Sequence, residues 1–147
     1  MDILKNLIRY AVIATASVFL ISCSSDDNSE EQQQTEQGFY YGENDITPFL
    51  KADDAWVNGN YNSIIAQNQG STIIEIVLTG LEEGTYDLSA PYAFTYVKGG
   101  HWIASTGTLT ITKNEENKLS GTFDTTSGSG VEGVNSVKGE FHNIPIN

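Results

Sequence analysis

Turn-forming residues interrupt this chain at short, regular intervals, and this spacing limits the folds that it can adopt. From Phe39 to Asn147, runs of β-branched and aromatic residues end in glycine or asparagine about every ten residues, as strands joined by tight turns do. No window of about 11 residues in this part has the apolar spacing of a helix. Connections of about two to five residues make neighbouring strands antiparallel. The sequence therefore predicts an all-β domain of about eight antiparallel strands, either a sandwich or a flattened barrel.

The apolar residues of the predicted strands indicate which side chains face the core. Ile103, Leu109 and Ile111 fall on one parity of the longest strand, so we expect them to share a face. Gly107 is expected to mark a bulge or bend in that strand, and Gly121 to face inward where another side chain needs room. The strands are predicted over residues 55–57, 61–67, 71–79, 85–88, 92–97, 101–112, 118–124 and 135–146.

Residues 1–22 have the organisation of a secretory signal peptide. Lys5 and Arg9 give the first residues a positive charge, and residues 10–21 are apolar with only Thr15 and Ser17 as interruptions. These residues are too few for a membrane-spanning helix, which needs about 20. The segment ends in Leu20-Ile21-Ser22-Cys23, which resembles the bacterial lipobox. The alternatives are a plain signal peptide with an incidental cysteine and a retained signal anchor.

The lipobox resemblance implies a lipid anchor at Cys23, the only cysteine of the chain. In such lipoproteins the thiol receives a diacylglyceryl group, the leader is removed, and the new amino terminus receives an acyl chain such as palmitate. Ser24 follows where an aspartate would mark inner-membrane retention, and Ser25-Asp26-Asp27 resembles a short acidic surface-export signal. We therefore expect an outer-membrane lipoprotein exposed on the cell surface, with the periplasmic leaflet as the alternative.

Residues 23–38 are predicted to be the acylated cysteine and a disordered tether. Ser24 to Gly38 holds five acidic side chains and no basic, aliphatic or aromatic one, so it cannot bury enough surface to fold. Residues 39–147 then form a single β domain with 13 acidic and five basic side chains, a net charge of −8. That charge argues against nucleic acid as a partner, because a basic surface supplies most of the affinity for phosphate backbones.

Aromatic side chains offer the best candidate for a ligand face. Six of them could form a platform for sugar rings or an apolar ligand: Trp56, Tyr86, Tyr92, Phe94, Tyr96 and Trp102. Tyr92, Phe94 and Tyr96 lie on the same side of the predicted strand 92–97. If that side faces solvent, the three side chains are exposed in a row. We take Tyr92, Phe94, Tyr96 and Trp102 as the candidate ligand face. The alternative is that these side chains pack in the core.

Metal and catalytic chemistry have little support in the residue pattern. His101 and His142 lack a third ligand for zinc, and no nucleophile motif is present. Glu75 and Glu140 are mid-strand acids, but both fall on parities that face solvent, unlike the paired acids of glycosidases. Four acids near the domain start match no calcium-binding loop: Glu43, Asp45, Asp53 and Asp54. We predict no catalytic residue, no metal and no cofactor.

Several segments resemble a family of small bacterial lipoproteins whose β domain has no assigned function. The resemblance rests on Ala55-Trp56, the strand 109–113, the block Lys118-Leu119-Ser120-Gly121-Thr122-Phe123 and the closing strand 139–145. It implies an all-β fold and a place in the cell envelope, and it supplies no catalytic residue. Asp124-Thr125-Thr126 also resembles a short bacterial O-glycosylation site.

Together these features favour a lipid-anchored, non-catalytic binding or accessory module. Its partners would be the membrane, through the N-terminal lipid, and a glycan, a small apolar ligand or an envelope protein. A structural envelope lipoprotein without a ligand is the alternative, and an enzyme comes third.

Overall fold

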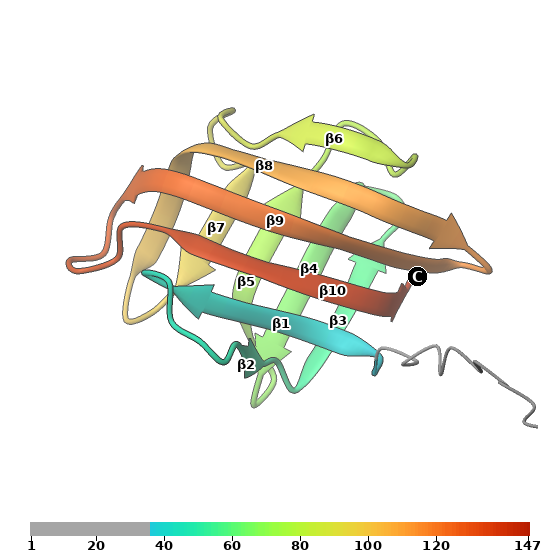
Figure 1. The fold of residues 1–147 in the computed structure, drawn as a ribbon, viewed down its shortest axis with the longest axis horizontal. Coiled ribbons are helices and arrows are strands. Elements are labelled where there is room, and N and C mark those ends of the chain that lie inside the picture. The colour runs from blue at the N-terminus through green and yellow to red at the C-terminus, as the bar shows by residue number, and fades with distance from the viewer. Residues whose placement is uncertain (1–35) are drawn as a thin grey trace, which may run out of the picture. The chain divides into compact units, whose positions relative to one another are not determined.

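The computed structural model describes residues 36–147, and these residues form an all-β domain (Figure 1). They contain no helix of the length and apolarity needed to cross a membrane. The leader, Cys23 and nearly all of the predicted tether lie outside the described residues. Ten strands are present in this part of the chain: β1 (Gly38–Glu43), β2 (Leu50–Lys51), β3 (Asp54–Asn58), β4 (Ser63–Asn68), β5 (Ser71–Val77), β6 (Gly84–Asp87), β7 (Phe94–Val97), β8 (His101–Glu115), β9 (Lys118–Ser129) and β10 (Val137–Pro145).

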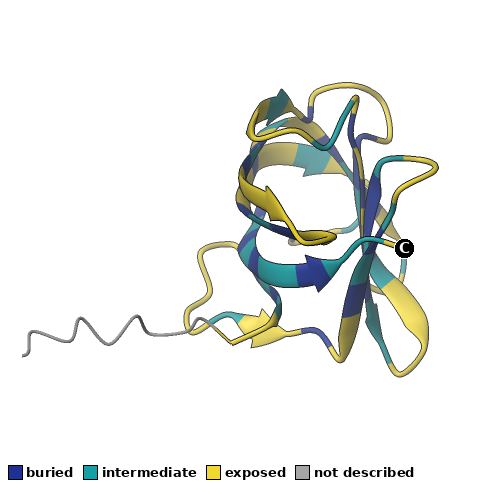
Figure 2. Cartoon of the chain, turned by 90° about the vertical axis from the view of Figure 1, so that its right-hand side faces the viewer, coloured by how far each residue is buried: buried dark blue, intermediate teal, exposed yellow. Residues whose placement is uncertain are grey.

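The strands belong to one curled sheet with the order β2-β1-β10-β9-β8-β7-β5-β4-β3, and β6 pairs with β8 beside this path. All pairings between these strands are antiparallel. Figures 1 and 2 show the sheet folded into two layers across the core. The front layer contains β1, β10, β9, the second half of β8, and β6; the back layer contains β3, β4, β5, β7 and the start of β8. The predicted antiparallel sandwich or flattened barrel is confirmed.

Strand β8 passes from one layer to the other. Its first residues pair with β7, and residues 108–111 pair with β6. Between these two regions the register with β9 shifts twice, from Ala104 to Thr106 and from Thr106 to Gly107. Bulges bend a strand and increase its twist, which allows one strand to serve both layers. The expected irregularity at Gly107 is confirmed.

The same bulges correct the predicted inward face of β8. Trp102 and Ala104 are buried before the bulges, and Leu109 and Ile111 are buried after them. An extra residue in a strand reverses the face on which the following side chains lie. The prediction that Ile103 shares a face with the two later residues is therefore wrong, and its side chain is half-buried on the outer side.

The C-terminal residues bridge the free edge of the sheet. Val57 in β3 forms an isolated parallel bridge with Ile146. The Asn147 amide donates to the Val57 carbonyl at 2.8 Å, and the Gly59 amide donates to the Asn147 carbonyl at 2.9 Å. These contacts connect the end of β10 to β3 and so bring the two sides of the curled sheet together.

Aromatic rings fill the centre of the core. The Phe39 and Phe123 ring centres lie 5.3 Å apart, and Phe94 and Phe123 lie 5.5 Å apart. Trp102 is fully buried, and its Nε1 donates to the Val134 carbonyl at 2.9 Å, which satisfies its one polar group. Gly121 is buried, and a Cβ at that position would lie 2.6 Å from the Phe141 ring. The predicted role of this glycine, to leave room for a facing side chain, is confirmed.

Candidate functional site

Three of the four residues of the predicted aromatic face lie in the core. Phe94 and Trp102 are fully buried, and Tyr96 is 6% exposed. Strand β7 begins at Phe94, and its aromatic parity faces the other layer across the core. Tyr92 precedes the strand with a φ of 63° and is 67% exposed. The prediction of an exposed row is therefore wrong for these three residues, and the alternative of core packing holds.

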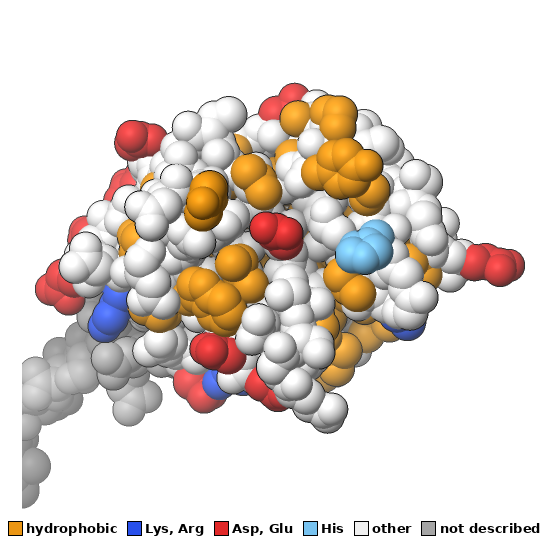
Figure 3. Space-filling view, turned by 180° about the vertical axis from the view of Figure 1, so that it is seen from behind, with side chains coloured by type: hydrophobic (Ala, Val, Ile, Leu, Met, Phe, Trp, Pro, Cys, Tyr) orange, Lys and Arg blue, Asp and Glu red, His pale blue; other side chains and the backbone are white. Residues whose placement is uncertain are grey.

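The opposite parity of the same strands carries an apolar surface that the sequence reasoning missed. One cross-strand row runs over five strands by direct register, through Trp56, Ile65, Glu75, Thr95 and Ile103. Figure 3 looks onto this side of the molecule and shows hydrophobic groups gathered around an acidic side chain. We call this surface the apolar face; its residues are Trp56, Ile65, Ile73, Glu75, Val77, Tyr92, Thr95, Val97, His101 and Ile103.

The apolar face is open to solvent, although most of its side chains are half-buried by their neighbours. Val77 is 42% exposed. The Val77 amide donates to the Ala93 carbonyl at 2.9 Å, which brings the exposed Tyr92 to the same end of the face. A bulky residue with a positive φ is uncommon, and here it lies in the turn before β7. On this face, half-buried apolar side chains of several strands adjoin the exposed Val77 and Tyr92.

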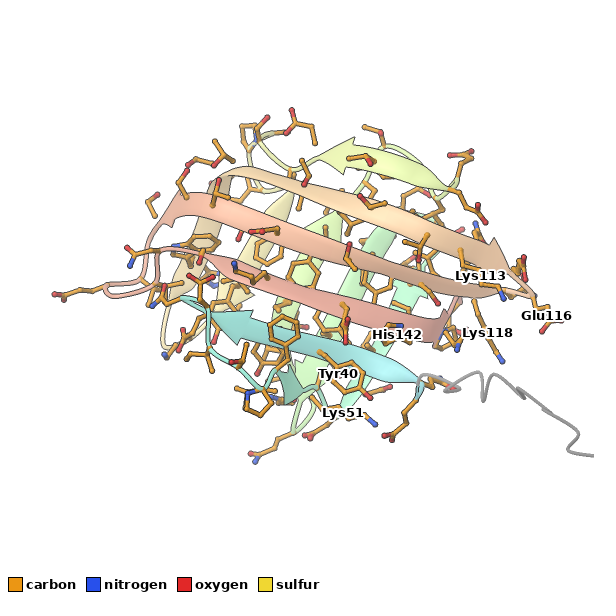
Figure 4. The ribbon with its side chains drawn as sticks, viewed as in Figure 1. Tyr40, Lys51, Lys113, Glu116, Lys118 and His142 are labelled. Atoms are coloured by element: carbon orange, nitrogen blue, oxygen red, sulfur yellow. The ribbon has the colours of Figure 1, made fainter. Side chains whose placement is uncertain are left out.

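The outer side of the front layer has a different composition. Most of its outward side chains are polar or charged: Thr85, Thr108, Thr110, Thr122, Lys138, Glu140 and His142. The exceptions are Tyr40 of β1 and the exposed Leu50 of β2 at the edge of this layer. Figure 4 labels Tyr40, Lys51 and His142 on this layer, and the Lys51 ammonium lies 5.5 Å from the centre of the Tyr40 ring. Both layers bury their inner side chains in the same core, and packing of that core does not require apolar side chains on the outer side of either layer. The difference between the two outer sides makes the outer side of the back layer the candidate interaction surface.

Glu75 is the one carboxylate of the apolar face. It lies on β5, between Ile65 of β4 and Thr95 of β7 in direct register. No lysine or arginine belongs to the face, and no salt bridge to Glu75 is present among the described residues. A single negative charge surrounded by apolar groups favours a ligand that brings a positive charge to the centre of an apolar surface.

A pattern in the sequence could have revealed this face. Adjacent apolar residues occur at Ile64-Ile65, Ile73-Ile74 and Ile76-Val77. Successive side chains of a strand point to opposite sides, so each pair places one apolar group in the core and one outside. The outward members of the three pairs are Ile65, Ile73 and Val77, which all belong to the apolar face.

Three of the four acids considered for calcium form contacts with other residues. Glu43 forms a salt bridge with Lys98, and Asp45 forms one with Lys138. The Asp53 carboxylate accepts a hydrogen bond from the Gln69 amide at 2.8 Å. No group of three metal-ligating side chains occurs within residues 36–147.

The remaining paired candidates lie apart. His101 opens β8 in the back layer, whereas His142 lies on β10 of the front layer, with its Nε2 3.4 Å from the Glu140 carboxylate. Glu75 and Glu140 likewise belong to different layers and do not form a catalytic pair.

Thr125 is the central residue of the segment that resembles a glycosylation site, and it is fully buried. Its hydroxyl donates to the Val137 carbonyl at 2.6 Å and accepts from the Val137 amide at 2.9 Å. This hydroxyl is therefore closed to modification in the folded domain. Thr126 is exposed, and its hydroxyl lies 2.8 Å from that of Thr106.

Comparison of the chain with models of known families, with curated proteins and with solved structures finds no match.

Proposed function

We propose that this chain is a lipid-anchored lipoprotein of the outer membrane, exposed at the cell surface, whose β domain is a non-catalytic binding module. The support for the anchor is the leader of residues 1–22 followed by Cys23. The support for binding is the apolar face on the outer side of the back layer, which contrasts with the polar outer side of the front layer.

The apolar face suits a protein of the cell envelope better than a small ligand. Its central row crosses five strands, which at about 4.8 Å between neighbours spans about 19 Å. Small apolar ligands are usually held in concave pockets that cover most of their surface, whereas protein partners bind flat surfaces of this width. Glu75 adds a requirement that the partner carry a lysine or arginine within its own apolar patch.

A photo-crosslinking amino acid introduced at Val77 tests this proposal in cells that produce the full lipoprotein. We expect a discrete crosslinked product with one envelope protein. The additional substitution Glu75→Lys should abolish the product, because it places like charges opposite each other, and Trp56→Ala should reduce it. Two separate controls use Thr122 on the front layer. The crosslinker placed at Thr122 should give no product, and Thr122→Lys combined with the crosslinker at Val77 should leave the Val77 product unchanged.

The outcomes separate the alternatives. A product at Val77 that survives Glu75→Lys would contradict the apolar face as the binding surface. No product at Val77 or Thr122 would favour a structural envelope lipoprotein without a ligand.

A further inference from the structure

A polar depression lies on the outer side of β6, β8 and β9, separate from the apolar face. Its volume is about 410 Å³, and it is lined by Asp87, Ser89, Thr106, Gly107, Thr108, Asp124 and Thr126. It forms where β8 bends between the two layers and β6 joins the sheet. Volumes of about 300–1,000 Å³ are typical of sites that hold small ligands.

The lining has one kind of chemistry. It presents two carboxylates, three threonine hydroxyls and one serine hydroxyl, with no aromatic and no cationic side chain. Carboxylates accept hydrogen bonds, and hydroxyls both accept and donate them. The depression is therefore matched to a ligand that carries several hydrogen-bond donors.

Asp87 is held in a fixed position. One carboxylate oxygen accepts from the Ser89 amide at 2.8 Å, and the other accepts from the Ser89 hydroxyl at 2.8 Å. These hydrogen bonds lower the pKa of Asp87, so its carboxylate stays charged at neutral pH.

The strand register places the two carboxylates on either side of one residue. Asp87 on β6 and Asp124 on β9 pair with the same residue of β8, Thr108, from its two sides. Their backbones are therefore two strand spacings apart, about 9.6 Å. Calcium takes about six to eight oxygen ligands, and no group of three acids or histidines that could hold a metal ion occurs within residues 36–147, so the lining favours a larger ligand over an ion.

We propose that this depression binds a saccharide, whose ring lies over Thr108 and donates hydrogen bonds to Asp87 on one side and Asp124 on the other. A sugar ring carries hydroxyl donors around its whole edge, so it reaches both carboxylates at once. Lys138 of β10 lies 4.0 Å from the Asp124 carboxylate and borders the site beyond it. No bond of the saccharide is broken.

Isothermal titration of the full-length lipoprotein in detergent tests the inference. The probes are neutral oligosaccharides of glucose, mannose, galactose and N-acetylglucosamine, with calcium chloride as a separate arm. We expect binding of at least one oligosaccharide, and about a tenfold or greater loss of affinity in both Asp87→Asn and Asp124→Asn, because hydrogen bonds to charged groups are the stronger ones. Asp54→Asn, at an exposed aspartate of β3, is the matched control and should bind normally.

Two results would overturn the inference. One is that no oligosaccharide binds, or that binding is unchanged in both depression variants. The other is that calcium alone binds and that both variants lose it, which would make the site a cation site. Because the apolar face lies on the other layer, neither result bears on the crosslinking experiment at Val77.

Discussion

Thr125 shows how much a single hydroxyl contributes inside this domain. It is one of two buried polar or charged residues among the described residues, together with Ser63. Its Oγ1 bonds to both the amide and the carbonyl of Val137, across the pairing of β9 with β10. The hydroxyl therefore satisfies two buried backbone groups of the neighbouring strand, and each of these is costly to leave without a partner.

Replacement of Thr125 by valine should lower the free energy of unfolding by about 2 kcal/mol, because the shape is kept while the Val137 amide and carbonyl lose their partner. Thr125→Ser keeps the hydroxyl and should cost less. Urea denaturation of the two variants and the wild type measures the difference. Equal stability of the valine variant and the wild type would contradict the role given to the hydroxyl.

The buried Tyr96 should make the stability of the domain depend on pH in alkaline solution. Burial, with smaller effects of Glu43 and Tyr41, raises the pKa of Tyr96 to about 12. Its neutral form is favoured in the folded state, so its contribution to stability is complete below about pH 10, where the unfolded tyrosine ionises, and is lost by about pH 12.

Tyr96→Phe should therefore weaken the loss of stability between about pH 10 and pH 12, since phenylalanine has no proton to lose. Thermal unfolding followed by circular dichroism at a series of pH values measures this. Tyr61→Phe is the control, because that side chain is 73% exposed and should leave the pH dependence as in the wild type. The same slope in all three proteins would contradict the prediction.

Residue parity was predictable wherever a strand is regular. Leu119 and Phe123 of β9 and Phe141 of β10 face the core as their alternation indicates. Ile103 does not follow the prediction, because the bulges in β8 reverse the parity after it and no residue type announces how many extra residues a bulge adds. The prediction of the ligand face failed because alternation shows which residues share a side of a strand, but not which side faces the core. In β7 the buried side is that of Phe94 and Tyr96.

At the scale of elements, the first two strands were the ones that the sequence analysis missed. Strand β1 was not predicted, although its run Phe39-Tyr40-Tyr41 consists of aromatic residues that are common in strands. It gains its place by pairing with β10, nearly 100 residues later, from Gly38 opposite His142 to Glu43 opposite Val137. A long-range pairing of this kind leaves no trace in local sequence patterns. Strand β2 is only two residues long and pairs with β1 alone.

Ile146 and Asn147 follow β10 and contact the edge of β3, so their removal should lower the stability of the domain. Deletion of Ile146 and Asn147 removes two backbone hydrogen bonds to the β3 edge, a third from the Ile146 amide to the Asn117 carbonyl, and a half-buried apolar side chain. We expect a loss of about 3 kcal/mol of stability, from about 1 kcal/mol for each contribution of this size, less the cost of ordering the tail.

Asn147→Ala is the matched control for this deletion, because it keeps the backbone bonds to Val57 and Gly59. Thermal unfolding compares the stabilities, and hydrogen exchange should show faster exchange at the Gly59 amide in the deletion variant only. An unchanged rate at that amide would contradict the role of the tail in bridging the sheet edge.

At the scale of the whole molecule, the two outer sides of the domain are suited to different partners. The back layer presents the apolar face, and the front layer presents the polar depression around Thr108. If both proposals hold, the domain binds an envelope protein on one side and a saccharide on the other. Composition and charge argued only against nucleic acid as a partner, and the register of the strands shows which side chains adjoin on each outer side.

The proposed lipid anchor at Cys23 determines in which cell fraction the whole molecule is found. Cys23→Ser removes the thiol that would receive the lipid, so the full chain should move from the membrane fraction to the soluble fraction. Fractionation of cells that produce either form, with immunodetection of the β domain, measures the shift, and Ser24→Ala is the control. Membrane retention of the Cys23→Ser variant would contradict the lipobox assignment.

The pairing of β1 with β10 has a mechanical consequence. In the proposed arrangement, a partner on the apolar face and a lipid at Cys23 would stretch the chain between them, and the tension would enter the domain at Gly38. A pull along β1 loads all six of its register positions with β10 together, because the hydrogen bonds lie across the strands. Strands sheared in this way resist separation better than strands that are unzipped one bond at a time. A tether that pulls along β1 would therefore load the first strand of the domain in the direction in which paired strands resist separation best.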